Sequence, residues 1–147
     1  PLPALDKAVV DARARGVEVN ILTNSKESID ADGKAMTDAI LDGLRVFAAA
    51  GANVYVQRGE TLHSKFMTVD GVYVNVGSYN MHPRSERYDT ELNVAILDAG
   101  TAAEFDEAFN RDIAGARRMT LEELNARKSG WFSRLLGRFG YSQLNPK

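Results

Sequence analysis

The chain has 147 residues, a length that suits one domain large enough to bury a hydrophobic core. Hydrophobic residues make up 44% and charged residues 26%, as in ordinary soluble globular proteins, and no apolar run approaches the ~20 residues of a membrane-spanning helix. Cysteine is absent, which excludes disulfide bonds.

The net charge of −2 is unevenly distributed along the chain. Residues 1–110 carry 10 Lys and Arg against 17 Asp and Glu, a net charge of −7. Residues 111–147 carry 8 against 3, a net charge of +5. The acidic body argues against unspecific binding of nucleic acid, and the basic C-terminal segment is the candidate for binding a surface.

Hydrophobic periodicity, together with glycine and capping residues, predicts alternating helices and strands. In chain order the predicted elements are a helix from Pro3 to Arg15, a strand from Val17 to Leu22, a polar loop from Thr23 to Gly33, a helix from Lys34 to Ala50, a strand from Asn53 to Gln57, a hairpin from Lys65 to Val76, a loop from Tyr79 to Asp89, a strand from Thr90 to Leu97, and a helix from Thr101 to Ala114. This order predicts an α/β fold with a mixed β-sheet flanked by helices.

After a body formed by residues 1–118, we expect residues 119–147 to form a basic amphipathic helical tail. The stretch Thr120–Glu123 has the pattern of a capping box, which begins a short helix. The stretch Trp131–Phe139 places five large apolar side chains beside two arginines. These apolar side chains either cover the core of the body or contact an anionic membrane surface.

A tight β-hairpin is predicted in the middle of the chain. The runs 65–69 and 72–76 are rich in β-branched and aromatic residues, and Asp70-Gly71 lies between them. An Asp-Gly pair between two such runs is typical of a two-residue hairpin turn.

A two-residue turn would determine which side chains share a face of this hairpin. Lys65 would face Val76, and His63 would face Ser78. Because side chains alternate between the two faces of a strand, these four and Asn80, if the strand continues, would lie on one face.

This group of side chains suits the chemistry of a phosphoryl group. Lys65 supplies a positive charge, and Asn80 and Ser78 supply neutral donors to phosphate oxygens. His63 can attack phosphorus or give a proton to a leaving oxygen. Glu91, on the following strand, could hold the second ring nitrogen and fix the tautomer. No cluster of metal ligands is visible in the sequence, so we expect charge stabilisation from the protein itself.

Several residue types therefore recur at fixed offsets around the hairpin, and they resemble the HKD signature of the phospholipase D superfamily. The sequence from His63 to Ile96 is most similar to those of bacterial cardiolipin synthases and related phosphatidyltransferases. The resemblance covers roughly Leu5 to Ala114. The matching residues are His63-Ser64-Lys65, Asp70, Gly77-Ser78-Tyr79-Asn80, Arg84-Ser85 and Glu91.

The resemblance implies a two-step phosphodiester transfer on phospholipids through a phosphohistidine, without a metal ion or other cofactor. It implies two HKD motifs that face each other, and this chain has one. Residues 1–118 would then be one half-domain that lacks its first strand. The second half-domain would come from the same parent protein or from a second copy. His63 would act either as the nucleophile or as the general acid.

The resemblance also implies a cytoplasmic enzyme that lies at the inner membrane surface, where its phospholipid substrate is. For each of the supporting residues, two roles stay open. Asp70 either forms the hairpin turn or takes part in the chemistry, and Arg84 and Ser85 either contact phosphate or anchor their loop. Two positions depart from the family pattern: Asp89 stands where an asparagine is frequent, and His82 where cardiolipin synthases often have an acidic residue.

Two other functions are compatible with these residues. One is a single-motif phosphodiesterase of the same superfamily that acts on nucleic acid as a homodimer, which the acidic body disfavours. The other is a non-catalytic binding domain, which the intact set of His63, Lys65, Asn80 and Glu91 disfavours. The sequence therefore favours the phospholipid enzyme.

Overall fold

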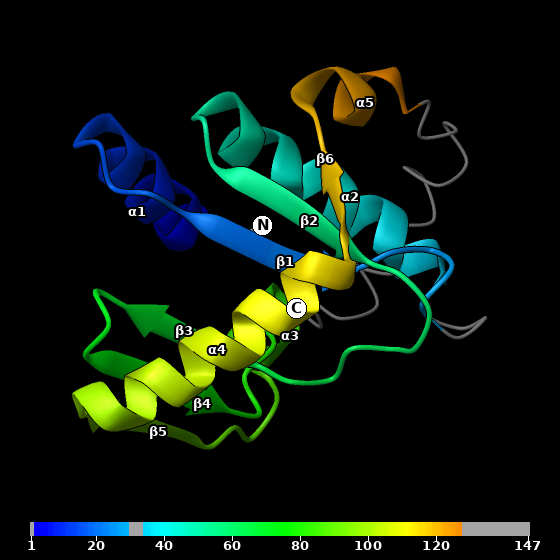
Figure 1. The fold of residues 1–147 in the computed structure, drawn as a ribbon. Helices are drawn as coiled ribbons and strands as arrows, with labels where there is room; N and C mark the ends of the chain where they lie inside the picture. The colour runs from blue at the N-terminus through cyan, green and yellow to red at the C-terminus, as the bar shows by residue number, and fades with distance from the viewer. Residues whose placement is uncertain (1, 30–33, 128–147) are drawn as a thin grey trace. The chain divides into compact units, whose positions relative to one another are not determined.

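The structure, a computed structural model, describes residues 2–29 and 34–127 (Figure 1). They form two compact units, one from the described residues up to Thr61 and from Ala116 onward, and one from Leu62–Gly115. The predicted α/β class is confirmed, and the strands form two three-stranded sheets with helices beside them. No helix in the described ranges is long and apolar enough to cross a membrane.

The first unit is built on a mixed sheet with the strand order β1-β2-β6, in which β1 and β2 are parallel and β6 is antiparallel to β2. Alternation in β2 turns Val54 and Val56 into the core, where they are 1% and 3% exposed. Side chains from all three helices join this cluster, so the helices share one face of the sheet. The elements are α1 (Pro3–Ala14), β1 (Asn20–Asn24), α2 (Lys34–Ala49), β2 (Asn53–Gln57), β6 (Arg117–Met119) and α5 (Leu121–Ala126).

The end of α1 explains why β1 begins later than the sequence suggested. Gly16 has a positive φ of 83°, and Val17 N donates to Ala12 O over 3.0 Å. This is the Schellman arrangement that closes a helix. Val17 therefore belongs to the end of α1, and the predicted strand 17–22 is found at Asn20–Asn24.

Helix α5 is short, but its beginning and its packing are well defined. The predicted capping box is confirmed, because Thr120 Oγ1 accepts from Glu123 N and the Glu123 carboxylate accepts from Thr120 N. Leu124 is fully buried in the core of the first unit. The stretch Trp131–Phe139 lies outside the described residues.

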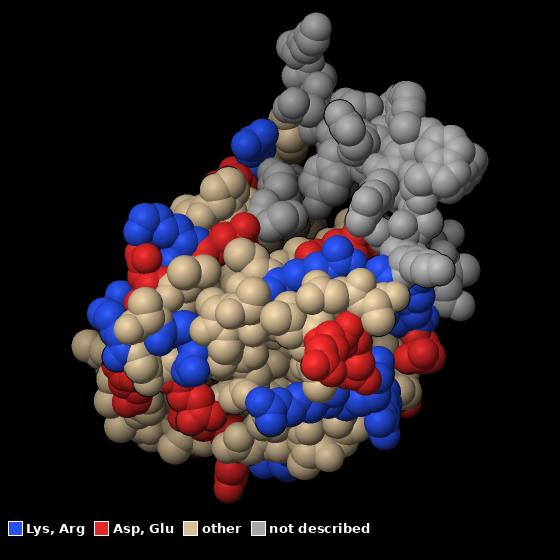
Figure 2. Space-filling model, turned by 90° about the horizontal axis from the view of Figure 1, so that it is seen from above, with Lys and Arg blue, Asp and Glu red and all other residues tan. Residues whose placement is uncertain are grey.

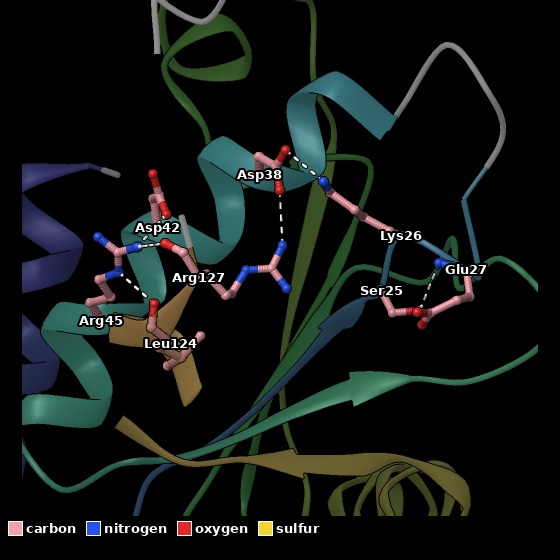
Figure 3. Close-up of polar contacts among 8 residues, drawn as sticks. All are labelled: Ser25, Lys26, Glu27, Asp38, Asp42, Arg45, Leu124 and Arg127. Atoms are coloured by element: carbon pink, nitrogen blue, oxygen red, sulfur yellow. Dashed lines mark hydrogen bonds and ion pairs between the residues drawn. The ribbon is translucent and has the colours of Figure 1, made fainter. Parts of the chain in front are cut away.

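Ion pairs and hydrogen bonds join α5 to α2 (Figure 3). Asp38 accepts from Arg127 over 2.9 Å and pairs with Lys26 over 2.7 Å. Arg45 Nε donates to the Leu124 carbonyl over 3.0 Å. Burial acts to raise the pKa of Asp38, but the hydrogen bonds and charges of Lys26 and Arg127 outweigh it and hold that pKa below its usual value.

The second unit is an antiparallel sheet with the strand order β3-β4-β5, and α4 lies along one face of it (Figure 1). Phe66 meets the ring of Phe105 edge-on at a centroid distance of 5.1 Å. Val74 and Ala102 are fully buried between the sheet and α4. The elements are β3 (Phe66–Val69), β4 (Tyr73–Gly77), α3 (Pro83–Arg87), β5 (Asn93–Leu97) and α4 (Ala99–Gly115).

The hairpin is present, but the predicted register is wrong by one residue. Asp70 and Gly71 have positive φ values of 53° and 64°, as the expected turn requires. Val72 N donates back to Val69 O, and Val72 O accepts from the backbone amide of Asp98, the residue directly after β5. Val72 therefore leaves the pairing with β3, and Tyr73 takes its place opposite Val69.

The observed register changes which residues of β4 lie opposite Lys65 and His63. Phe66, and not Lys65, pairs with Val76. Lys65 O accepts from Gly77 N over 3.1 Å, so Lys65 lies opposite Gly77. The predicted pairing of His63 with Ser78 fails for the same reason.

At Gly77 the end of β4 comes unusually close to the start of β5. A Cβ atom there would lie 2.1 Å from Leu92 O and 2.2 Å from Asn93 Oδ1. No side chain fits at such distances, so the close approach requires glycine.

Strand β5 is one of the two edge strands of this sheet among the described strands, and several apolar side chains on it or beside it are exposed. Leu92, just before the strand, is 75% exposed, and Leu97 at its end is 81% exposed. Val94 is 50% exposed.

We predict that Asp38→Asn lowers the free energy of unfolding by about 1–3 kcal/mol, because two charged partners lose their carboxylate. The folded-state pKa of Asp38 lies below its unfolded value. Its contribution is therefore complete above the unfolded pKa of about 4 and is lost as the pH falls through the folded pKa. Urea unfolding between pH 7 and pH 2 measures both effects. Equal stability of the two proteins at pH 7 would contradict the prediction.

We predict that Gly77→Ala costs about 1–3 kcal/mol of stability, since β4 and β5 must move apart. Gly115→Ala is the matched control, because a Cβ at Gly115 meets nothing within 4 Å. Denaturant unfolding of both variants is the measurement. A Gly77→Ala protein as stable as the control would show that the strands are not held so closely.

Candidate active site

Among the residues whose side chains the structure describes, six in the second unit line an open pocket of about 440 Å³. They come from the segment before β3, the end of β4 and the segment before β5. Five of them are predicted site residues, and Gly77 is the sixth. The lining residues are His63, Lys65, Gly77, Ser78, Asn80 and Glu91.

His63 and Lys65 lie on the extended segment that leads into β3. Lys65 Nζ donates to the carbonyl of His63 over 2.6 Å, which holds the ammonium group close to the histidine backbone. The His63 side chain is exposed. The Gly77 amide bonds to Lys65 O, so the end of β4 supports this segment. An imidazole and an ammonium group, the latter bonded to the histidine's own carbonyl, therefore both line the pocket.

Ser78 connects the end of β4 to the segment before β5 through hydrogen bonds. Its hydroxyl donates to the Glu91 carboxylate and accepts from Leu92 N over 3.0 Å. Its backbone amide donates to Leu92 O, also over 3.0 Å. The proton of Ser78 is thus already used by Glu91, which makes Ser78 a support of the pocket in this state.

Glu91 is held as a carboxylate. The hydrogen bond from Ser78 is the main cause that lowers the pKa of Glu91. The nearby Ser85 hydroxyl acts in the same direction, although its oxygen is buried without a partner in hydrogen-bond geometry among the described residues. Glu91 was expected to hold the ring of His63, but within the described ranges the ring has no hydrogen-bond partner, and the carboxylate is bonded to Ser78.

Asn80 follows this tied segment and is exposed at the pocket. The next residue, Met81, has a positive φ of 52°, a conformation that costs a non-glycine residue about 1–2 kcal/mol. The chain turns sharply there and enters α3 at Pro83. The backbone around Asn80 is therefore constrained on both sides.

The described side chains of Asp70 and Ser85, two further predicted residues, are not among those that line the pocket. Asp70 is an exposed residue of the hairpin turn, where its positive φ has a structural role. Ser85 is buried in α3, and its amide donates to Nδ1 of His82 over 3.1 Å. Arg84 also belongs to α3.

One residue of this region was missed. Asn93 begins β5, and its carboxamide contacts both β4 and the backbone of Tyr79. A polar amide two residues after Glu91, at the start of an otherwise apolar run, was the available signal.

The arrangement can support phosphoryl chemistry with groups of its own. An imidazole can form or break a bond to phosphorus, an ammonium and a carboxamide can stabilise phosphate oxygens, and a carboxylate supplies a fixed negative charge. In the described ranges, no three His, Asp or Glu side chains are grouped as a metal ion would require.

Known proteins resemble this chain in sequence and in fold. Cardiolipin synthase 2 of Staphylococcus epidermidis is 34% identical over 122 residues, which are 80% of this chain and 24% of that protein. The major cardiolipin synthase of Bacillus subtilis is 32% identical over 108 residues, or 74% of this chain and 22% of that protein. The chain thus spans about a quarter of the length of these relatives.

Two crystal structures share the fold. Nuc of Salmonella typhimurium, a phospholipase D family member, matches with a TM-score of 0.65 and 24% identity, over 80% of this chain and 74% of that chain. Phosphatidylserine synthase of Haemophilus influenzae matches with a TM-score of 0.70 and 21% identity, over 95% of this chain and 36% of that chain.

Residues 1–113 match the family model described as "Cardiolipin synthase, PLD-like domain". This match covers more than half of the chain. The chain belongs to the phospholipase D superfamily, in the PLD-like domain family of the cardiolipin synthases.

Proposed function

We propose that this chain supplies one of the two HKD motifs of an enzyme that transfers phosphatidyl groups between alcohols through a phosphohistidine. The observation that carries the proposal is the pocket, which brings His63, Lys65, Asn80 and Glu91 together. The names of the curated relatives support a phospholipid as the substrate. The phosphodiester of that phospholipid would lie over the pocket.

The reaction has two displacements. In the first, an imidazole nitrogen attacks phosphorus, and the leaving alcohol takes a proton from the histidine of the other motif. In the second, that histidine accepts the proton of the incoming alcohol, whose oxygen displaces the imidazole. His63 serves either as the nucleophile or as the proton donor, and each role needs the other motif.

Lys65 and Asn80 would stabilise the negative charge that develops on the phosphoryl oxygens. An ammonium and a carboxamide are donors of this kind, and both line the pocket. Glu91, an ionised carboxylate fixed by Ser78, would favour a positive charge on the imidazole as it forms. The reaction would therefore need no metal ion.

The proposed partners are a phospholipid, a second HKD half-domain and an anionic membrane. Nucleic acid is a poor partner, because the first 110 residues carry a net charge of −7. On the face drawn in Figure 2, described side chains of both signs are interspersed. The basic residues 111–147 would hold the enzyme at the inner, cytoplasmic membrane surface.

We predict that this chain alone has almost no phosphatidyl-transfer activity, and that the complete enzyme with both halves is active in the presence of a chelator. His63→Ala in the complete enzyme should lower turnover by about 10²–10⁴-fold. The measurement is the transfer of a labelled phosphatidyl group to an added alcohol.

The control is His82→Asn, which replaces the other histidine of the chain and keeps an acceptor for the Ser85 amide. Near-normal turnover by a folded His63→Ala enzyme would contradict the assignment. Strong activity of the chain alone would refute the need for a separate half if the sample is monomeric. If the sample is dimeric, it would indicate the homodimeric phosphodiesterase.

We predict that the C-terminal segment binds anionic vesicles and that added salt weakens the binding. Each basic residue near such a surface contributes about 1 kcal/mol. Deletion of residues 129–147 should abolish co-sedimentation and leave the fold intact, because Leu124 and Arg127, which hold α5 in place, remain. Vesicles of neutral lipid are the control. Unchanged binding after the deletion, or unfolding caused by it, would favour packing of the segment on the body.

A further inference from the structure

The side chain of Asn93 spans two segments that border the pocket. Asn93 is the first residue of β5 and pairs with Gly77 at the end of β4. Its Oδ1 accepts from the backbone amide of Tyr79 over 3.3 Å, and its Nδ2 donates to Asn75 Oδ1 over 2.8 Å. One carboxamide therefore links β4 to the segment that follows it.

This segment carries two lining residues, Ser78 and Asn80, on either side of Tyr79. The segment is also held by Leu92, whose backbone forms hydrogen bonds with both the amide and the hydroxyl of Ser78. β4 ends at Gly77, so no regular strand pairing holds Tyr79. The Asn93 carboxamide is the described partner of the Tyr79 amide.

We propose that Asn93 is a positioning residue of the pocket: it fixes the backbone of Tyr79 and thereby the places of Ser78 and Asn80. Asn93 acts through these residues, because it is not itself among those that line the pocket. It is exposed, and an exposed hydrogen bond adds little to the stability of the fold. Its loss should change the geometry of the site more than the stability of the fold. The part of the proposal that concerns turnover rests on the proposed function.

The first test uses this chain and needs no substrate. Asn93→Leu keeps the approximate size of the side chain and removes both hydrogen bonds, whereas Asn93→Asp keeps an acceptor for Tyr79 N. We expect amide hydrogen exchange at Tyr79, followed by NMR, to become at least about tenfold faster in Asn93→Leu, as loss of one hydrogen bond predicts. Asn93→Asp should retain most of the protection.

The matched control is Asn53→Leu in the other unit. Asn53 also bridges two neighbours with its carboxamide, since it donates to Asn20 over 2.9 Å and accepts from Arg118 over 2.5 Å. Tyr79 exchange should be unchanged in this control. Unchanged exchange in Asn93→Leu, or an equal increase in the control, would overturn the proposal.

The second test uses the complete enzyme. Asn93→Leu should lower kcat by about 10–100-fold with a smaller change in KM, because small displacements of catalytic groups slow the chemical step. Asn93→Asp should recover part of the loss, and Asn53→Leu should stay near the wild-type value. If kcat falls only in proportion to a lower melting temperature, Asn93 has a purely structural role, and the proposal is overturned. A wild-type enzyme without phosphatidyl transfer would instead refute the proposed function, while the exchange experiment still decides the role of Asn93.

Discussion

The close approach of two backbones at Gly77 is the constraint on which the pocket depends. Because no side chain stands there, β5 begins near enough to the end of β4 for Leu92 to bond to Ser78. Ser78 can then donate to Glu91, whose carboxylate is fixed at the pocket. The Gly-Ser pair of the motif thus has a structural explanation. Gly77 leaves room for the neighbouring strand to approach, and Ser78 forms hydrogen bonds with the residues before that strand.

The sequence predicted most elements of the fold and the group of residues around the pocket, for physical reasons that can be named. Strand β2 lies at its predicted bounds because Val54 and Val56 alternate with polar residues around one core. The strand β6 was missed because Arg117 and Arg118 carry no apolar alternation; pairing with β2 alone makes it a strand. The helix α3 was read as a loop because it is only five residues long.

The register of the hairpin could not be predicted, because the carbonyl of Val72 accepts from Asp98 N, directly after β5. A two-strand pattern contains no information about that partner. The pocket residues nevertheless come together, since the chain leaves the strand after Gly77 and alternation no longer determines where Ser78 and Asn80 point. The prediction named the right neighbours but gave an incorrect reason for their proximity.

The exposed edge of β5 has a thermodynamic consequence. Leu92 and Leu97 are largely exposed in the described structure, and covering such a side chain contributes about 1.5–3 kcal/mol. Any segment or subunit that covers the edge would bind the folded sheet and not the unfolded chain, so its binding free energy would add to the stability of the second unit. With such a neighbour, folding of this unit and binding at β5 would form one linked equilibrium, and a substitution at Leu97 would affect both.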